Sequence, residues 1–197
     1  MTPVISREIR NRIEQNGENR LYAVNDFADL NNDALVTRVL SRLKNENFLI
    51  RISQGLYLYP SENRFGILKP SLDTIAKAIA EKDKARIIPS GSTALNVLGL
   101  STQVPMNAVY LTDGTPRTIA VGNRKIIFKK SAPRNFTYKS ELFSLVVSAM
   151  KEIGEEKIDE EIISKIKSIL NKENDQATIR QDFLSAPQWI RKKMNMI

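Results

Sequence analysis

Two stretches of the sequence contain side chains whose types and spacing could bind or transform a ligand. The first, residues 32–59, combines small polar and cationic side chains at helical spacing with a glycine-containing turn. Hydroxyl, amide and guanidinium groups in such an arrangement can bond to base edges and phosphates. The second is Gly91-Ser92, a pair that can hold a phosphate at a helix start, with Asp113 as the nearest acid downstream. Nucleic-acid binding and phosphoryl transfer are therefore the two chemistries to weigh.

Phosphoryl transfer at Gly91-Ser92 is disfavoured by the acids that the sequence lacks. Nucleotidyltransferases bind magnesium through paired carboxylates, and Asp113 stands alone beside Gly114, where a turn explains it. The chain also has no histidine and no cysteine, which excludes Ser-His-Asp triads, thiolate chemistry and His-ligated metals. We therefore expect no catalytic residue, no metal site and no cofactor, and interpret Gly91 and Ser92 as a turn and a helix cap.

Residues 32–59 predict a helix followed by a two-stranded hairpin. Asn32 can cap a helix whose apolar side chains recur with a period of 3.6. The period then changes to two on both sides of Ser53-Gln54-Gly55, as in two short strands joined by a turn. The helix has an apolar face of Leu35, Val36, Val39, Leu40 and Leu43, and an opposite face of Thr37, Ser41 and Asn45, flanked by Arg38 and Lys44, with Arg42 near the edge.

Two more helices are expected before this one, at about residues 6–16 and 25–30. Three helices and a hairpin in this order are typical of a winged helix-turn-helix, whose last helix fits the major groove of DNA, about 12 Å wide. The alternative is a solvated face, because any surface helix of a basic protein exposes some arginine and lysine. The polar outer face favours nucleic acid over a protein partner, which would more often meet an apolar face.

The formal net charge of +8 is concentrated in the middle of the chain. Residues 1–60 hold eight Lys/Arg against seven Asp/Glu, residues 61–139 thirteen against five, and residues 140–197 nine against ten. Such an excess attracts an anionic partner, although a solvated sheet face would also explain it. Its densest part, here called the basic segment, consists of Arg117, Arg124, Lys125, Lys129, Lys130, Arg134 and Lys139, with no acid between them.

The whole chain predicts an α+β protein with an N-terminal winged helix-turn-helix (1–60), a linker (61–70) and a second, mixed domain (71–197). In the second domain, three strand-like pieces at 108–129 are joined by short glycine turns, which predicts a small antiparallel meander. Apolar stripes beyond Leu142 predict C-terminal helices. No apolar run reaches the about 20 residues that a membrane span needs, and no signal peptide is recognisable. We expect no membrane association and a cytoplasmic location.

Three parts of the sequence resemble one known family. The winged-helix end of AbiEi-type antitoxins, from abortive-infection (type IV) toxin–antitoxin pairs, is similar to RLKNENFLIRISQGLYLYP (42–60). The start of that family's second domain is similar to SGSTALNVLGLSTQVP (90–105), followed by a strand ending in Val109-Tyr110-Leu111-Thr112. The tail of a smaller related group, usually filed as a domain of unknown function, is similar to LSAPQWIRKKM (184–194).

The resemblance implies a DNA-binding autorepressor and a non-catalytic antitoxin, with double-stranded DNA of its own promoter and a nucleotidyltransferase-like toxin encoded next to it as partners. It also implies that a positive surface of the second domain helps to bind DNA, which gives the basic segment a role. The alternative is a winged-helix module that binds protein or RNA without sequence-specific DNA binding. Carried onto this chain, the resemblance implies that eight residues face DNA. They are Thr37, Arg38, Ser41, Arg42 and Lys44 on the helix, and Arg51, Ser53 and Gln54 around the wing.

Overall fold

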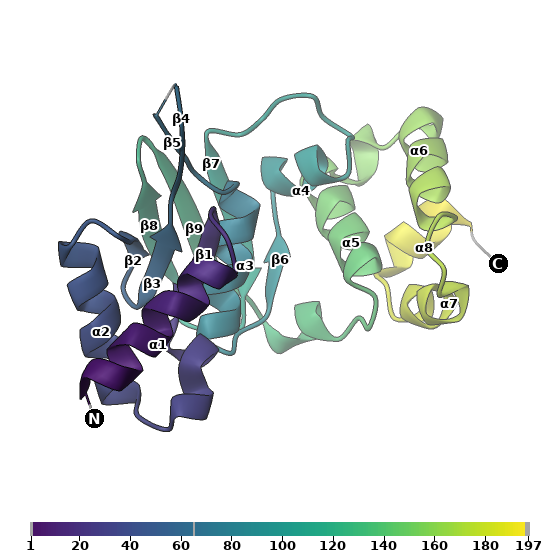
Figure 1. Ribbon diagram of the computed structural model, residues 1–197. Helices are drawn as coiled ribbons and strands as arrows, with labels where there is room; N and C mark the ends of the chain where they lie inside the picture. Colours follow the sequence, from purple (N-terminus) through teal and green to yellow (C-terminus); the bar gives the residue numbers. More distant parts are fainter. Residues whose placement is uncertain (1, 65, 196–197) are drawn as a thin grey trace. The chain divides into compact units, whose positions relative to one another are not determined.

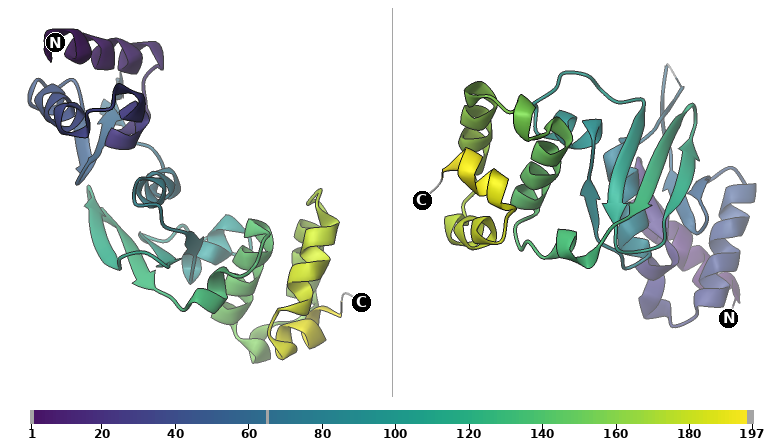
Figure 2. Two further views of the ribbon diagram at one scale, coloured as in Figure 1. Left: turned by 90° about the horizontal axis from the view of Figure 1, so that it is seen from below. Right: turned by 180° about the vertical axis from the view of Figure 1, so that it is seen from behind.

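The computed structural model describes residues 2–64 and 66–195. The chain divides into two units, Met1–Lys84 and Ala85–Ile197, each with its own apolar cluster (Figures 1 and 2). Small antiparallel sheets and C-terminal helices are present, so the predicted α+β class is confirmed. Within the described ranges, none of the helices has the length and apolar character needed to cross a membrane.

The first unit consists of helices that share an apolar cluster with a three-stranded antiparallel sheet of order β1-β3-β2. The helical spacing of the sequence explains the cluster, since Ile9 and Ile13 of the first helix and Leu40 of the next α-helix are fully buried. The elements are α1 (Thr2–Gln15), β1 (Arg20–Ala23), the 3₁₀ helix η1 (Val24–Leu30), α2 (Asp33–Asn45), β2 (Ile50–Ser53), β3 (Leu56–Tyr59), β4 (Ser61–Asn63), β5 (Gly66–Leu68) and α3 (Leu72–Lys82).

The segment expected to be a linker, 61–70, instead contains the paired strands β4 and β5, and α3 belongs to the first unit. Two contacts explain the placement of α3. The side-chain amide of Asn25 donates to the carbonyl of Lys82 at 3.3 Å. The aliphatic part of Lys82 lies beside the β2–β3 turn, with its Cδ 3.8 Å from where a Cβ on Gly55 would be. The units therefore divide after Lys84, whereas the sequence predicted boundaries at 60 and 71.

The second unit contains a four-stranded sheet of order β6-β7-β9-β8, followed by a group of helices. Its apolar cluster is centred on α5, where Phe143, Val146 and Met150 are fully buried. The elements are β6 (Ile87–Pro89), α4 (Ser92–Val97), β7 (Asn107–Thr112), β8 (Arg117–Val121), β9 (Arg124–Lys130), η2 (Pro133–Phe136), α5 (Glu141–Ile153), η3 (Glu155–Lys157), α6 (Glu160–Leu170), α7 (Gln176–Leu184) and α8 (Gln188–Met194).

The predicted antiparallel meander is wrong in this sheet, because β9 lies between β7 and β8 and is parallel to β7. The Gly122-Asn123 turn does form the antiparallel β8–β9 hairpin. The connection from β7 to β8 is not a hairpin turn. Its Thr112 hydroxyl donates to the carbonyl of Arg86 at 3.1 Å and accepts from the N–H of Gly114 at 3.0 Å. The first bond ties the end of β7 to the residue before β6, and the second holds the local bend of the connection.

Candidate nucleic-acid interface

Helix α2 begins where the sequence predicts, and its caps fix which face points outward. Asn32 Oδ1 accepts the N–H of Leu35 at 3.1 Å, and Asp33 adds negative charge at the positive end of the helix. Val36 and Leu40 are fully buried. With this face held in the core, the opposite side of α2 is presented to solvent.

The outer face of α2 is polar and exposed, as predicted. Thr37, Arg38, Ser41 and Lys44 are all exposed. The Thr37 hydroxyl donates to the carbonyl of Asp33 at 2.8 Å, and the Lys44 ammonium reaches only a neighbouring side-chain amide, at 3.5 Å. Within the described part of the chain, the side chains of Arg38 and Ser41 have no hydrogen bond or ion pair. The Arg38 guanidinium is therefore free to bind a ligand without losing a bond within the protein.

Arg42 turns toward α1, although the sequence predicted that it would face DNA. Its Nη2 donates to Ser6 Oγ on α1, and its Nε lies 3.4 Å from Glu46 Oε1. The helical wheel places Arg42 near the edge of the outer face, and α1 packs along that edge. Its side chain is still 55% exposed, so it could reach a ligand only by leaving these partners.

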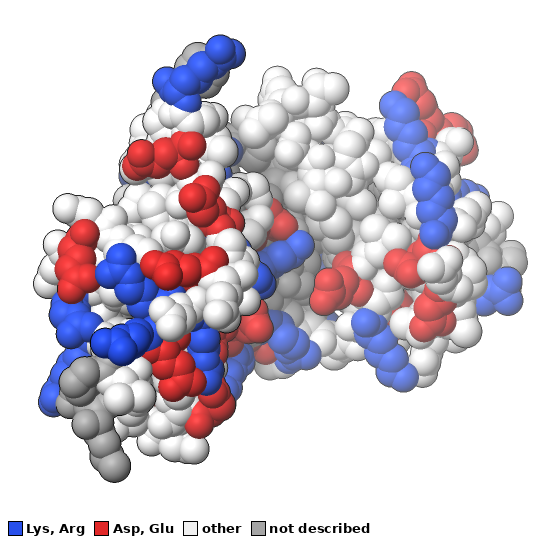
Figure 3. Space-filling model, in the orientation of Figure 1, with Lys and Arg blue, Asp and Glu red and all other residues white. Residues whose placement is uncertain are grey.

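Four acidic residues of the first unit form ion pairs with the arginines Arg10 and Arg12 of α1. Arg10 lies 3.2 Å from Glu14 and 3.7 Å from Glu46, and Arg12 pairs with Glu8 and Asp29 at 2.5 and 2.7 Å. Figure 3 shows this side as a mixture of positive and negative charges. The net charge of residues 1–60 is therefore almost zero, but the positive and negative side chains are unevenly distributed over the unit. Four acids pair with arginines of α1, while Arg38 and Lys44 on the outer face of α2 make no ion pair within the described residues.

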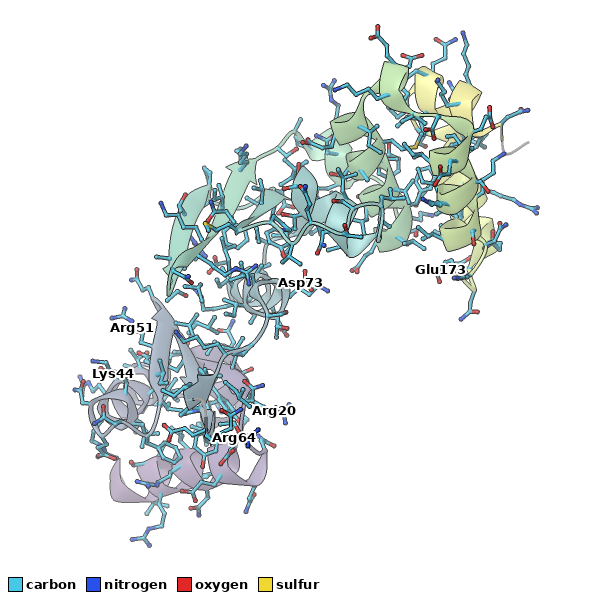
Figure 4. All side chains as sticks on the ribbon, turned by 90° about the horizontal axis from the view of Figure 1, so that it is seen from above. Arg20, Lys44, Arg51, Arg64, Asp73 and Glu173 are labelled. Carbon is cyan, nitrogen blue, oxygen red and sulfur yellow. The ribbon has the colours of Figure 1, made fainter. Side chains whose placement is uncertain are left out.

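The β2–β3 hairpin brings further polar groups to the same unit. Gly55 closes its turn with φ of +70°, a conformation that costs little without a Cβ. Arg51 is exposed, and its Nε donates to the carbonyl of Ser53 at 3.3 Å; Ser53 itself is half-buried and Gln54 is exposed. In the view of Figure 4, Arg51 and Lys44 lie on one side of the unit and Arg20 lies on the other. The predicted helix and wing positions therefore lie on the same side of the unit in this view.

The basic segment does not form a single surface. Side chains alternate along a strand, so Lys125 and Lys129 of β9 are exposed on one face of the sheet, and Arg124 and Lys130 lie on the face of the buried Ile126. Arg134 is exposed on η2. The other four interact within the unit. Arg124 donates to the carbonyls of Pro105 and Met106 at 3.1 and 3.2 Å, and Lys130 donates to those of Asp113 and Gly114 at 2.5 and 3.2 Å. Lys139 donates to the side-chain oxygen of Gln181 at 3.2 Å, and the Arg117 guanidinium lies 5.8 Å from the Phe128 ring centre.

Gly91-Ser92, the second stretch, forms a corner between β6 and α4. Gly91 precedes the helix with φ of +60°. A Cβ at Gly91 would lie 3.6 Å from Oε1 of Glu152, so a carboxylate already stands beside this corner. The next residue, Thr93, is buried and its hydroxyl accepts the N–H of Val109 at 2.9 Å. A carboxylate at this place repels phosphate, which agrees with the structural interpretation of the pair.

Asp113 is bound by Arg86, which sequence reasoning did not single out. Its two carboxylate oxygens accept the backbone N–H and the Nε–H of Arg86, both at 2.8 Å. These bonds hold the pKa of Asp113 below its usual value, and the bond from the Arg86 guanidinium contributes more than the bond from the Arg86 backbone. No group of three or more potential ligands for a metal ion occurs among the described residues.

Asp182 is a second structural acid that no sequence pattern indicated. It is 4% exposed, and its oxygens accept the N–H groups of Lys139 and Ser140 at 3.1 and 2.7 Å. A residue of α7 thus caps the start of α5 from more than 40 positions away. Local capping patterns cannot reveal such a contact.

One family model matches the chain, over residues 8–178. The match starts in α1 and ends in α7, so it includes the α2 face, the hairpin and the basic segment. The chain belongs to the DUF6088 family. DUF6088 is described as a family of unknown function, so membership leaves the resemblance to AbiEi-type antitoxins a prediction. No curated protein matches this DUF6088 member.

Proposed function

We propose that the chain is a DNA-binding repressor of its own promoter, with the first unit acting as a winged helix-turn-helix. The observation that carries this proposal is the outer face of α2, which is exposed, polar and cationic, and whose Arg38 has no partner among the described side chains. A guanidinium without a partner in the protein can bind a guanine edge or a phosphate without first breaking another interaction.

The order of elements supports the same assignment. Helix α1, the short η1 and α2 are followed at once by the β2–β3 hairpin, and β1 pairs with β3 to complete a small sheet. In a winged helix-turn-helix, the last helix of the three enters the major groove and the hairpin lies beside the backbone. α2 is then the recognition helix, and Arg51 and Gln54 lie on the wing.

The charge distribution also predicts how binding depends on salt. Arg38, Lys44 and Arg51 are the cations of the proposed face that form no ion pair within the described residues. If all three contact phosphate, the logarithm of the binding constant falls with the logarithm of salt concentration with a slope of about −3 per protein chain. This slope is shallow for a DNA-binding protein, so contacts other than ion pairs with phosphate must supply most of the affinity.

The test is binding of the purified protein to the DNA upstream of its own gene, beside an unrelated duplex of equal length, across a salt series. Tighter binding to the upstream DNA that survives physiological salt supports the proposal. Equal and steeply salt-dependent binding to both duplexes favours the alternative, a winged-helix module for RNA or protein. Absence of binding to either duplex refutes a DNA-binding role.

For the second unit we propose a non-catalytic antitoxin role, in which it binds a nucleotidyltransferase-like toxin encoded next to it. A specific observation favours a protein partner here: from Ile87 to Thr112 the sequence has no charged residue. Val97 at the end of α4 is 51% exposed, and Val104 and Met106 in the loop between α4 and β7 are 71 and 70% exposed. Figure 3 shows an uncharged area where this loop runs. Nucleic acid requires cations at its contact surface, whereas a protein partner can cover exposed apolar groups.

The loop is also fixed in place, which suits a docking surface. The side-chain amide of Asn96 donates to the carbonyls of Ser101 and Gln103 at 3.4 and 3.1 Å. At its other end, Arg124 binds two carbonyls of the loop. An ordered loop loses little conformational entropy when a partner binds.

Co-purification with the product of the adjacent gene tests this second proposal. The variant Val104→Asp/Met106→Asp should lose the partner and fail to relieve its toxicity, while DNA binding stays unchanged. Leu184→Asp is the matched control, because Leu184 is 60% exposed on α7, away from the loop in sequence. Equal co-purification of both variants would show that the loop is not the contact.

A further inference from the structure

The sheet of the second unit has two edges that differ in how they are protected. One edge is β6, which has three residues and ends in Pro89. The carbonyl of Pro89 accepts the hydroxyl of Ser148 from α5 at 2.8 Å. Short length, a proline and a bond to a covering helix are the usual means by which a sheet edge avoids pairing with another chain.

The opposite edge, β8, has none of these protections. It pairs with β9 in unbroken register from Arg117 to Val121, so no bulge interrupts it. Its interior holds neither lysine nor proline, and Thr118 and Ala120 are exposed. In the described part of the chain, the backbone of Thr118 to Val121 makes no hydrogen bond outside the β9 pairing. Such an edge offers a row of donors and acceptors to a further strand.

The sequence of β8 is complementary to itself in the antiparallel direction. A two-fold axis through Ile119 places Ile119 opposite Ile119 of a second copy, Thr118 opposite Ala120, and Arg117 opposite Val121. The central pair is β-branched on both sides, and no like charges stand opposite each other, which are the two conditions that favour cross-strand pairing. A shift of the register would lose this match.

We propose that β8 pairs with β8 of a second copy of this chain, joining two four-stranded sheets into one sheet of eight strands. The proposal requires neither DNA nor a toxin. The lysines on the exposed face do not oppose it, because the two copies of β9 are three strand spacings apart, about 14 Å. Exposed charges at that separation are largely screened at physiological ionic strength, where the Debye length is about 8 Å.

Sedimentation of the purified full chain at rising concentration is the first test. The mass should rise from 22.3 kDa toward twice that value. Thr118→Glu/Ala120→Glu should restore the monomer, because the new carboxylate at position 118 of one copy would face the new carboxylate at position 120 of the other. Within one chain the change is tolerable, since Ala120 is paired with Lys125. An unchanged melting temperature shows that the variant is folded. A wild type that stays monomeric at its highest soluble concentration overturns the proposal.

A disulfide experiment tests the register and uses the absence of cysteine in the chain. Directly opposite residues of antiparallel strands have Cα atoms about 4.5–5.5 Å apart, within the range of a disulfide. Ile119→Cys should therefore form a covalent dimer under mild oxidation. Ala120→Cys is the control: the side chain is more exposed, but the two copies would be roughly 8 Å apart, too far to bridge. Equal cross-linking of both variants, or of neither, contradicts the pairing.

Discussion

Replacing Arg38 by alanine tests the proposed interface most directly, because this side chain has no described partner to lose within the protein. A bidentate contact with a base contributes about 1–3 kcal/mol, so its loss should weaken binding to the upstream DNA by about 5- to 150-fold. Arg42 must first leave Ser6 and Glu46. Exposed ion pairs contribute about 0–1 kcal/mol to stability, and losing these contacts reduces the free energy that Arg42 can contribute to DNA binding. We therefore expect Arg42→Ala to weaken binding less than Arg38→Ala does.

The assay is fluorescence anisotropy with the upstream duplex and an unrelated duplex at several salt concentrations. Arg20→Ala is the matched control, since it removes one charge from the other side of the unit in the view of Figure 4. Contact of Arg38 with a base predicts a loss confined to the upstream duplex. Contact with phosphate predicts an equal loss on both duplexes and a salt slope reduced by about one.

Two results would refute the reasoning. Equal effects of Arg38→Ala and Arg20→Ala would mean that α2 does not enter the groove and that only total charge matters. A larger effect of Arg42→Ala than of Arg38→Ala would mean that Arg42 leaves α1 to bind DNA, so that its contacts in the free protein do not predict its role.

Three further predictions concern stability. Leu40→Ala removes a fully buried side chain of α2 and should lower the free energy of unfolding by about 2–5 kcal/mol, measured by urea denaturation; a loss below about 1 kcal/mol would contradict the described core. Asp182→Ala leaves two backbone N–H groups at the start of α5 without an acceptor and should cost roughly 3 kcal/mol, seen as a lower melting temperature, whereas an unchanged melt would argue against the cap. Because Arg86 lowers the pKa of Asp113 in the folded chain, the carboxylate stabilises the fold above its unfolded pKa of about 3.9, and this stabilisation is lost as the pH falls through the lower folded pKa. Asp113→Asn should therefore flatten the acid side of the stability profile below about pH 4, and thermal unfolding that shows the same acid slope in both proteins would exclude the contribution.

The parts of the fold that the sequence predicted are those set by local patterns. Helix α2 follows from the 3.6-residue period and from Asn32 at its start, and the hairpin follows from the change of period around Gly55. The order of strands in the second sheet could not be predicted in this way. Short glycine turns indicate that strands follow one another, but β9 is placed by its parallel pairing with β7, in which Asn107 lies opposite Lys125, 18 positions away.

The candidate site shows the same limit. Counting charges predicted the basic segment, but it could not show that Arg124 and Lys130 are bound to backbone carbonyls. A helical wheel predicted the outer face of α2, but it could not show that α1 would take Arg42. In each case, the missing information is a partner far away in sequence. The direction of a side chain is local, whereas its availability for a ligand depends on the tertiary structure.

The insertion of β9 between β7 and β8 also constrains the order in which the sheet assembles. The β8–β9 hairpin closes over the short Gly122-Asn123 turn, and such hairpins form within microseconds. The pairing of β7 with β9 spans 18 positions between Asn107 and Lys125, so it costs more loop entropy and follows later. The β8–β9 hairpin therefore forms before it pairs with β7. During synthesis, the sheet cannot be completed until Lys130 has been added to the chain. Extra residues at Thr115-Pro116, which are exposed, would lengthen the connection without changing this order, so this is the point where the sheet can accept an insertion.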